Sequence, residues 1–220
     1  MKHKLLFLIA VSFLLISNFK VKAQEINYGV KAGLNYSNFK TSNTGRFDYE
    51  YKSFYHAGIY ADVSINEKIK IQPELLYSAQ GSKVFLDESD LMGGTNPVDQ
   101  VIAGSKSEFK YSFNYLLLPI MMEFNFYKGF FIAAGPQSGY LISSKQELID
   151  NSNSYFTNEG INGDFKKFTI DFNFGMGYEF KNGMNVNLRY SLGLNNINKS
   201  DFVEYKNSVY QFSIGYSILN

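Results

Sequence analysis

Apolar and polar residues alternate one by one through most of the stretch from residue 165 to residue 197. Every second residue from Phe168 to Phe180 is Phe, Ile, Met or Tyr, and the residues between them are mostly small or polar. After Lys181-Asn182-Gly183 the same period resumes and continues to Leu194. A two-residue period is typical of a strand with one apolar face, and Asn-Gly between two such runs indicates a hairpin. Each run has about a dozen residues, enough to cross a bilayer at a tilt, so the sequence predicts a transmembrane hairpin.

The alternation recurs along the chain and predicts eight strands in all. They cover residues 26–39, 55–65, 69–81, 109–126, 130–142, 168–180, 184–194 and 209–219. Long polar connections follow the first, third, fifth and seventh strands, and tight turns follow the second, fourth and sixth. Short turns at one end and long loops at the other are typical of an outer-membrane barrel with both termini in the periplasm. The predicted fold is therefore all-β, an eight-stranded antiparallel up-and-down transmembrane β-barrel.

Two prolines interrupt this pattern. Pro73 has no N–H, so we expect a bulge or a local widening of the ladder in the third strand. Around Pro119 the fourth strand is apolar on both sides, and a bulge at this proline would exchange its two faces. The faces of the fourth strand therefore stay undecided from the sequence.

The composition of the polar face indicates which side of the barrel points inward. That face consists largely of Gly, Ser, Asn and Gln, which fit a narrow eight-stranded interior, whereas the opposite face is Phe, Tyr, Leu, Ile and Val. We therefore expect Phe172 and Leu188 to face lipid, and Asn173 and Asn187 to face the lumen. The alternative is a soluble lipocalin-like barrel, which has the same period with its apolar side inward.

The first 23 residues have the features of a signal peptide. Basic residues precede an apolar run from Leu5 to Ile16, and Val21-Lys22-Ala23 provides a small-residue cleavage site. We expect cleavage after Ala23 and a barrel domain over residues 24–220; the alternative is an uncleaved anchor helix. Cleavage would leave 17 basic and 20 acidic residues, a net charge of −3, which gives no indication of a nucleic-acid partner. The absence of cysteine excludes disulfides and a thiolate nucleophile.

Isolated charges on the polar face are the main candidate site. We hypothesise that Glu74, Asp171 and Arg189 form an ionic network that plugs the lumen, because isolated charges in a narrow interior need partners. The alternative is that these charges are solvated near the two mouths. Further charges on this face are Lys31, Asp62, Lys70 and Glu179. At eight strands side chains fill the interior, so a wide pore is not expected.

Other candidates for chemistry are weaker. His56 is the only histidine after residue 23 and lies on the polar side, where it could act as a base beside a serine. No nucleophile motif accompanies it, so an interior or rim histidine is the simpler interpretation. Asp87, Glu88 and Asp90 lack the glycine and final glutamate of a calcium loop. Gly175-Met176-Gly177 lies within a strand and opens no helix, so it is no nucleotide motif. No metal or cofactor is expected.

Several segments resemble the outer-membrane β-barrel domain family common in Bacteroidetes, which includes the PorT-like proteins. These segments are residues 29–39, 72–77, 115–119, 135–140, 171–177 and 189–194. The resemblance implies an integral protein of the cell outer membrane with no common enzymatic activity, and some relatives are tied to protein secretion and gliding. We therefore expect a structural or binding role through long extracellular loops, with outer-membrane lipid and an external protein as partners. The alternatives are an accessory component of a secretion system and a lipid-modifying enzyme that uses His56.

Overall fold

The computed structural model describes residues 26–41, 47–86, 108–150, 153–159, 165–199 and 204–218, and these residues form ten strands. The strands are β1 (Ile26–Lys40), β2 (Phe47–Glu50), β3 (Lys52–Ser64), β4 (Ile69–Leu86), β5 (Glu108–Tyr127), β6 (Phe130–Asp150), β7 (Asn153–Glu159), β8 (Phe168–Glu179), β9 (Met184–Gly193) and β10 (Lys206–Ile218). Within these ranges, no helix is both long and apolar enough to cross a membrane.

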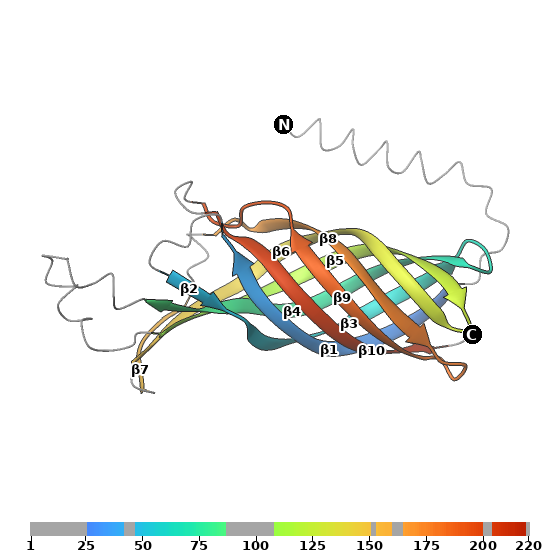
Figure 1. Ribbon diagram of the computed structural model, residues 1–220, viewed down its shortest axis with the longest axis horizontal. Coiled ribbons are helices and arrows are strands. Elements are labelled where there is room, and N and C mark those ends of the chain that lie inside the picture. Colours follow the sequence, from blue (N-terminus) through green and yellow to red (C-terminus); the bar gives the residue numbers. More distant parts are fainter. Residues whose placement is uncertain are drawn as a thin grey trace, which may run out of the picture.

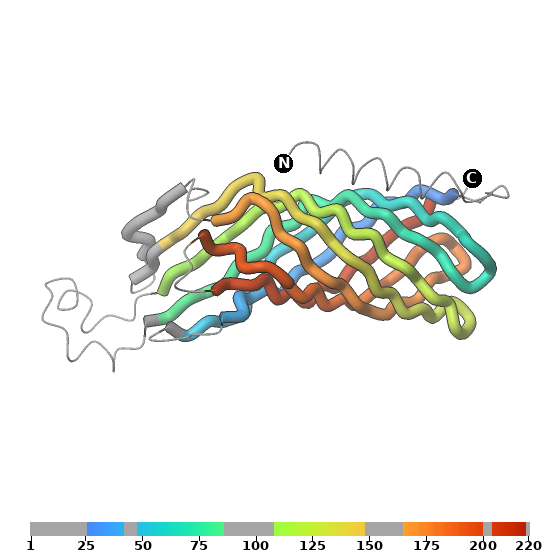
Figure 2. The backbone as a smooth tube through the Cα atoms, turned by 90° about the horizontal axis from the view of Figure 1, so that it is seen from above, coloured from blue at the N-terminus to red at the C-terminus, as the bar shows by residue number. Residues whose placement is uncertain are grey.

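Eight of the strands close into an antiparallel ring (Figure 1). Going round the ring, the order is β1, β3, β4, β5, β6, β8, β9 and β10, and β10 pairs with β1 again. The strands run obliquely to the long axis of the barrel (Figure 2). The predicted eight-stranded up-and-down barrel is therefore confirmed, and its closure leaves no open sheet edge around the ring.

Three short turns lie at the end of the barrel where β1 begins and β10 ends (Figure 1). Between β5 and β6, Lys128 and Gly129 both have positive φ angles, 38° and 92°, as a two-residue type I′ turn requires. Between β8 and β9, Gly183 has φ of 85° and donates its N–H to the carbonyl of Phe180. The three tight turns lie where the sequence predicts them, and two of them contain a glycine in a backbone conformation that other residues adopt rarely.

The two faces of the barrel are those predicted from composition. Phe172 and Leu188 are exposed on the outer surface, whereas Asn173 and Asn187 are buried in the lumen. Most of the exposed large apolar side chains lie on the outer faces of the eight ring strands, which together form an apolar exterior. The interior is lined mainly by Ser, Asn, Gln, Gly and a few charged residues, with an apolar cluster around Phe113, whereas the exposed large apolar side chains lie outside. This arrangement excludes the inside-out lipocalin-like alternative.

The structure also fixes the faces of β5. Pro119 is buried in the lumen between the outward-facing Leu118 and Ile120, so the alternation continues through the proline without a change of face. The irregularity in this part of the ladder lies instead at Asn114/Tyr115, where the pairing partner on β6 skips one residue. At Pro73 the register of β4 with β5 is the same before and after the proline, so only the pairing is interrupted and no bulge forms.

Two ring strands continue five or more residues past the predicted loop boundaries. β4 extends to Leu86 and β6 to Asp150, into segments that the sequence predicts as polar connections. The short strands β2 and β7 also lie in predicted connections and pair with these two extensions. Backbone pairing with a neighbouring strand stabilises these segments although their side chains show no clear alternation. The predicted signal peptide and the Asp87, Glu88 and Asp90 group lie outside the described residues.

Candidate functional site

The lumen is filled at three successive levels, and β1 contributes one residue to each. Lys31, Asn35 and Phe39 all point inward and follow one another at intervals of four residues. Four residues of a strand span about 13 Å. The lumen therefore has an ionic level near the short turns, a neutral polar level above it, and an aromatic level toward the long loops.

The ionic level contains two cations that share one carboxylate. Arg189 of β9 donates from both terminal nitrogens to Glu74 of β4, at 2.7 and 3.0 Å. The Nζ of Lys31 donates to the same Glu74 carboxylate at 2.7 Å and to the Gln72 side chain at 3.1 Å. The amide of Gln72 in turn donates to Asp62 of β3 at 2.7 Å. Every member is buried, so this bonded chain joins four strands of the ring across the interior.

The structure thus brings Glu74 and Arg189 together and places Asp171 elsewhere. The register of β8 with β9 sets Gly175 opposite Arg189 and Asp171 four residues farther along, opposite Gly193. There the Asp171 carboxylate accepts a hydrogen bond from Gln137 at 3.0 Å. A shared face, which is what the sequence indicates, does not specify the height of a residue in the barrel. Lys70 and Glu179 form a separate pair at 2.6 Å.

The neutral polar level is organised around His56 of β3. Its Nδ1 lies 2.8 Å from the side-chain oxygen of Asn35, and its Nε2 lies 2.7 Å from the hydroxyl of Ser213 on β10. The Asn35 oxygen can only accept, so Nδ1 carries the proton and Ser213 donates to Nε2. Gln211 also donates to Asn35, at 3.0 Å. The histidine is 2% exposed, which places it within the packed interior.

A glycine makes room for this histidine. A Cβ at Gly33 would lie 2.7 Å from the His56 ring and 2.0 Å from the carbonyl oxygen of Phe212. The ring therefore packs directly against the backbone of β1, which only glycine permits here. The sequence places His56 on the luminal face, but Asn35 and Ser213 lie far from it along the chain. Only the pairing of β1 with both β3 and β10 brings the three residues together.

The aromatic level closes the lumen toward the long loops. Phe113 and Tyr115 of β5 are fully buried and pack with Phe39 and with Phe165. The ring centroids of Phe113 and Phe165 are 4.7 Å apart in an edge-to-face arrangement, a geometry favoured for aromatic pairs. The sequence shows the alternation that places Phe113 and Tyr115 on one face, but not that this face is luminal.

Above the aromatic level, a pocket of about 210 Å³ opens near the ends of β1, β4 and β5. The hydroxyls of Tyr49 and Tyr205 lie 3.1 Å apart at this pocket, and the Gln146 amide donates to Tyr111 at 3.0 Å. Burial and the Tyr205 hydroxyl raise the pKa of Tyr49 above that of a free tyrosine, so its hydroxyl stays neutral at physiological pH. The pocket thus offers aromatic faces with neutral polar groups.

The residues described by the structure contain no group of three or more His, Asp or Glu side chains arranged to hold a metal ion. Among the luminal charges, Lys31 and Arg189 both bind Glu74, and Lys70 binds Glu179. The arrangement can fill and rigidify a barrel.

A family model and several solved structures match this chain. The family model described as "Outer membrane protein beta-barrel domain" matches residues 22–199. Among solved structures, the chain is similar to Ail, the attachment invasion locus protein of Yersinia pestis, with 12% identity, a TM-score of 0.47, and coverage of 88% of this chain and 99% of Ail. For OprG of Pseudomonas aeruginosa the identity is 11%, the TM-score 0.46 and the coverage 90% and 98%. For Neisserial surface protein A the identity is 9% and the TM-score 0.46, and the match covers 87% of this chain and 97% of that protein. A comparison with curated proteins gave no match.

The family match covers most of the chain, and the closed ring of eight strands with an apolar exterior is the architecture that the family name describes. The chain therefore belongs to the outer membrane protein beta-barrel domain family.

Proposed function

We propose that this outer-membrane barrel is not an enzyme, that its lumen is closed to ions, and that it binds an external partner at its loop end. The observation that carries the proposal is the filled lumen. The bonded chain from Arg189 to Asp62 crosses the interior, and the cluster around Phe113 packs above it. Solute passage would require both levels to come apart.

Features of the loop end support a binding role. The long strands β4, β5 and β6 extend the wall of the barrel at the loop end, where residues 87–107 connect β4 to β5. A rigid barrel holds such connections in a defined position, which is how many scaffolds present binding residues. The aromatic pocket beside Tyr49 and Tyr205 provides a concave surface there.

The surroundings of His56 favour a structural role over catalysis. Both of its ring nitrogens are already bonded, and the residue lies below the aromatic level, away from the lipid-facing surface. A lipid substrate would have to enter the packed lumen to reach it. We therefore assign His56 to interior packing.

Two measurements test closure and chemistry. In planar bilayers the purified barrel should give no stable open-channel conductance; steady opening of wild-type barrels would overturn the closed lumen. Incubation with phospholipid or lipopolysaccharide should give no hydrolysis. Hydrolysis that disappears in His56→Gln, but persists in the lipid-facing control Leu118→Ala, would overturn the non-enzymatic assignment.

A third measurement tests which end of the barrel faces outward. Because the chain has no cysteine, a single introduced cysteine can be labelled without background. In intact cells, a membrane-impermeant maleimide should label Glu50→Cys at the loop end. It should label Asn182→Cys at the turn end only after the outer membrane is permeabilised. The reverse pattern would remove the loop end as a surface for external partners.

The resemblance to PorT-like proteins supports a second candidate, an accessory role in protein secretion. The resemblance lies in segments such as residues 72–77 and 189–194. A deletion strain should then retain secreted cargo inside the cell, and should recover export when the wild-type gene is restored. Normal export in the deletion strain would leave only the binding role.

A further inference from the structure

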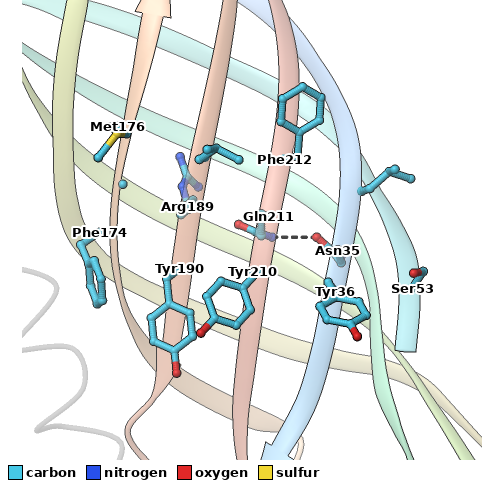
Figure 3. A pocket seen from close by; sticks show the side chains of 13 residues that line it. Asn35, Tyr36, Ser53, Phe174, Met176, Arg189, Tyr190, Tyr210, Gln211 and Phe212 are labelled. Carbon is cyan, nitrogen blue, oxygen red and sulfur yellow. Dashed lines mark hydrogen bonds between the residues drawn. The ribbon is translucent and has the colours of Figure 1, made fainter. Parts of the chain in front are cut away.

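A groove of about 450 Å³ crosses the outer face of the barrel over β8, β9, β10 and β1 (Figure 3). Its lower part, toward the short turns and at the top of Figure 3, is lined by apolar side chains that include Leu34, Leu188 and Phe212. Figure 3 shows Phe174 and Met176 at the left side of the groove, and the tyrosines of its upper end, toward the long loops, at the bottom of the picture. Because this face of the barrel contacts hydrocarbon, the groove is suited to an acyl chain. We call it the tyrosine groove, after the residues at its upper end.

The upper end of the tyrosine groove is bordered by a cluster of tyrosines near the outer rim. The rings of Tyr190 and Tyr210 have centroids 4.7 Å apart, and those of Tyr36 and Tyr51 are stacked at 4.8 Å. The hydroxyls of Tyr51 and Tyr190 both lie within hydrogen-bond distance of the Ser208 hydroxyl, at 3.3 and 2.9 Å. Tyrosines with anchored hydroxyls are typical of the level where hydrocarbon meets lipid headgroups.

Two lysines lie directly opposite each other above these tyrosines. Lys40 at the end of β1 pairs across the ladder with Lys206 at the start of β10. Both positions belong to the outward-facing alternation of their strands, so the two lysines lie at the same level on the outer face of the barrel. The Nζ of Lys40 lies 5.5 Å from the ring centroid of Tyr190, and Lys206 has an exposed contact of 3.4 Å with Glu204. An exposed contact of that kind contributes little, so the lysine pair keeps a positive field at the head of the groove.

A second groove on the same barrel provides a contrast. It has about 690 Å³ and lies between residues such as Ile120, Phe124 and Phe172, and its described lining contains no charged residue. Both grooves face hydrocarbon and can accept an acyl chain. Only the tyrosine groove leads from apolar walls to hydroxyl-bearing rings and then to two cations.

We propose that the tyrosine groove is a specific site for an outer-leaflet lipid whose phosphate headgroup carries a net negative charge, with an acyl chain in the groove and the phosphate beside Lys40 and Lys206. The lipid phosphate would accept charge-assisted hydrogen bonds from both lysines. A lysine near a lipid surface attracts anionic lipid by about 1 kcal/mol, or roughly fivefold in affinity. The groove selects a lipid over free phosphate, because only a lipid has an acyl chain that can fill its apolar part.

Fluorescence quenching by chain-brominated lipids tests the proposal, because the chain has no tryptophan. The reporter Phe212→Trp lies in the tyrosine groove, and the matched reporter Phe172→Trp lies in the second groove. Each is reconstituted in vesicles of phosphatidylcholine with a minor fraction of brominated phosphatidylglycerol or of brominated phosphatidylcholine. At Phe212→Trp we expect the relative binding constant to favour phosphatidylglycerol by about fivefold or more. At Phe172→Trp we expect a ratio near one.

The lysines are tested in the same reporter. Adding Lys40→Gln and Lys206→Gln to Phe212→Trp should bring the ratio near one. The control Lys128→Gln should leave it unchanged, although Lys128 makes a similar contact with Tyr127 at the turn end, at 5.2 Å. Leu34→Trp repeats the measurement from the other wall if Phe212→Trp does not fold. Equal quenching by both lipids in the tyrosine groove, or a preference that survives loss of both lysines, would overturn the proposal.

Discussion

The shared carboxylate of the ionic level makes Glu74→Gln the most informative substitution. It preserves the size of the side chain but leaves Lys31 and Arg189 facing each other in the lumen, with side chains 2% and 6% exposed. Removing one partner of a buried ion pair costs roughly 3–5 kcal/mol, because the charge left behind has lost its water and its partner. Here two cations lose their partner, so we expect a loss at the upper end of that range. Arg189→Met should cost less, since Lys31 still neutralises Glu74.

The assay is urea unfolding in lipid vesicles, with the folded fraction measured from the faster migration of unboiled barrels on gels. Glu147→Gln is the matched control, because it removes the carboxylate of an ion pair at the same 2.7 Å distance, but with Lys145 41% exposed. That control should change the free energy of unfolding by at most about 1 kcal/mol. If Glu74→Gln were no more destabilising than Glu147→Gln, the buried network would not hold the barrel together and the reasoning would fail.

Three further substitutions address other parts of the barrel with the same assay. His56→Leu should cost about 1–3 kcal/mol, because the Ser213 hydroxyl loses its acceptor; a neutral result would mean that the histidine contributes no net stabilisation. Phe113→Ala removes the ring at the centre of the aromatic level and should cost about 3–5 kcal/mol, with the outward-facing Leu118→Ala as a milder control. Gly183→Ala forces an L side chain into the φ of 85° between β8 and β9 and should cost about 1–2 kcal/mol, whereas Lys181→Ala in the same turn should not.

Much of the barrel could be predicted because its pattern is local. Whether Phe172 points outward and Asn173 inward depends only on the two-residue period of one strand and on the kind of side chain that each environment accepts. The turn at Gly183 is likewise encoded by neighbouring residues. These features need no knowledge of which strands meet across the barrel.

The site could be predicted only in part, because it depends on strand register. Glu74 and Arg189 are both on the luminal face, but their contact depends on how β4 and β9 are staggered around the ring. The same stagger separates Asp171 from them. The partners of His56 could not be identified for the same reason, since Asn35 and Ser213 reach it only through pairings on both sides of β1. The strands β2 and β7 depend on pairing with extended neighbours, which their own residues do not indicate.

Because the strands differ in length, the barrel wall is higher on one side than on the other. β6 has 21 residues and β9 has 10, and at a tilt near 40° these rise roughly 50 Å and 25 Å along the barrel axis. The hydrocarbon layer is about 30 Å thick, so it can enclose the full height of β9 but not that of β6. The wall built by β4, β5 and β6 therefore stands about 20 Å clear of the lipid on one flank. In the orientation proposed above, with the loop end outward, an external partner would contact this flank before the lower side of the rim.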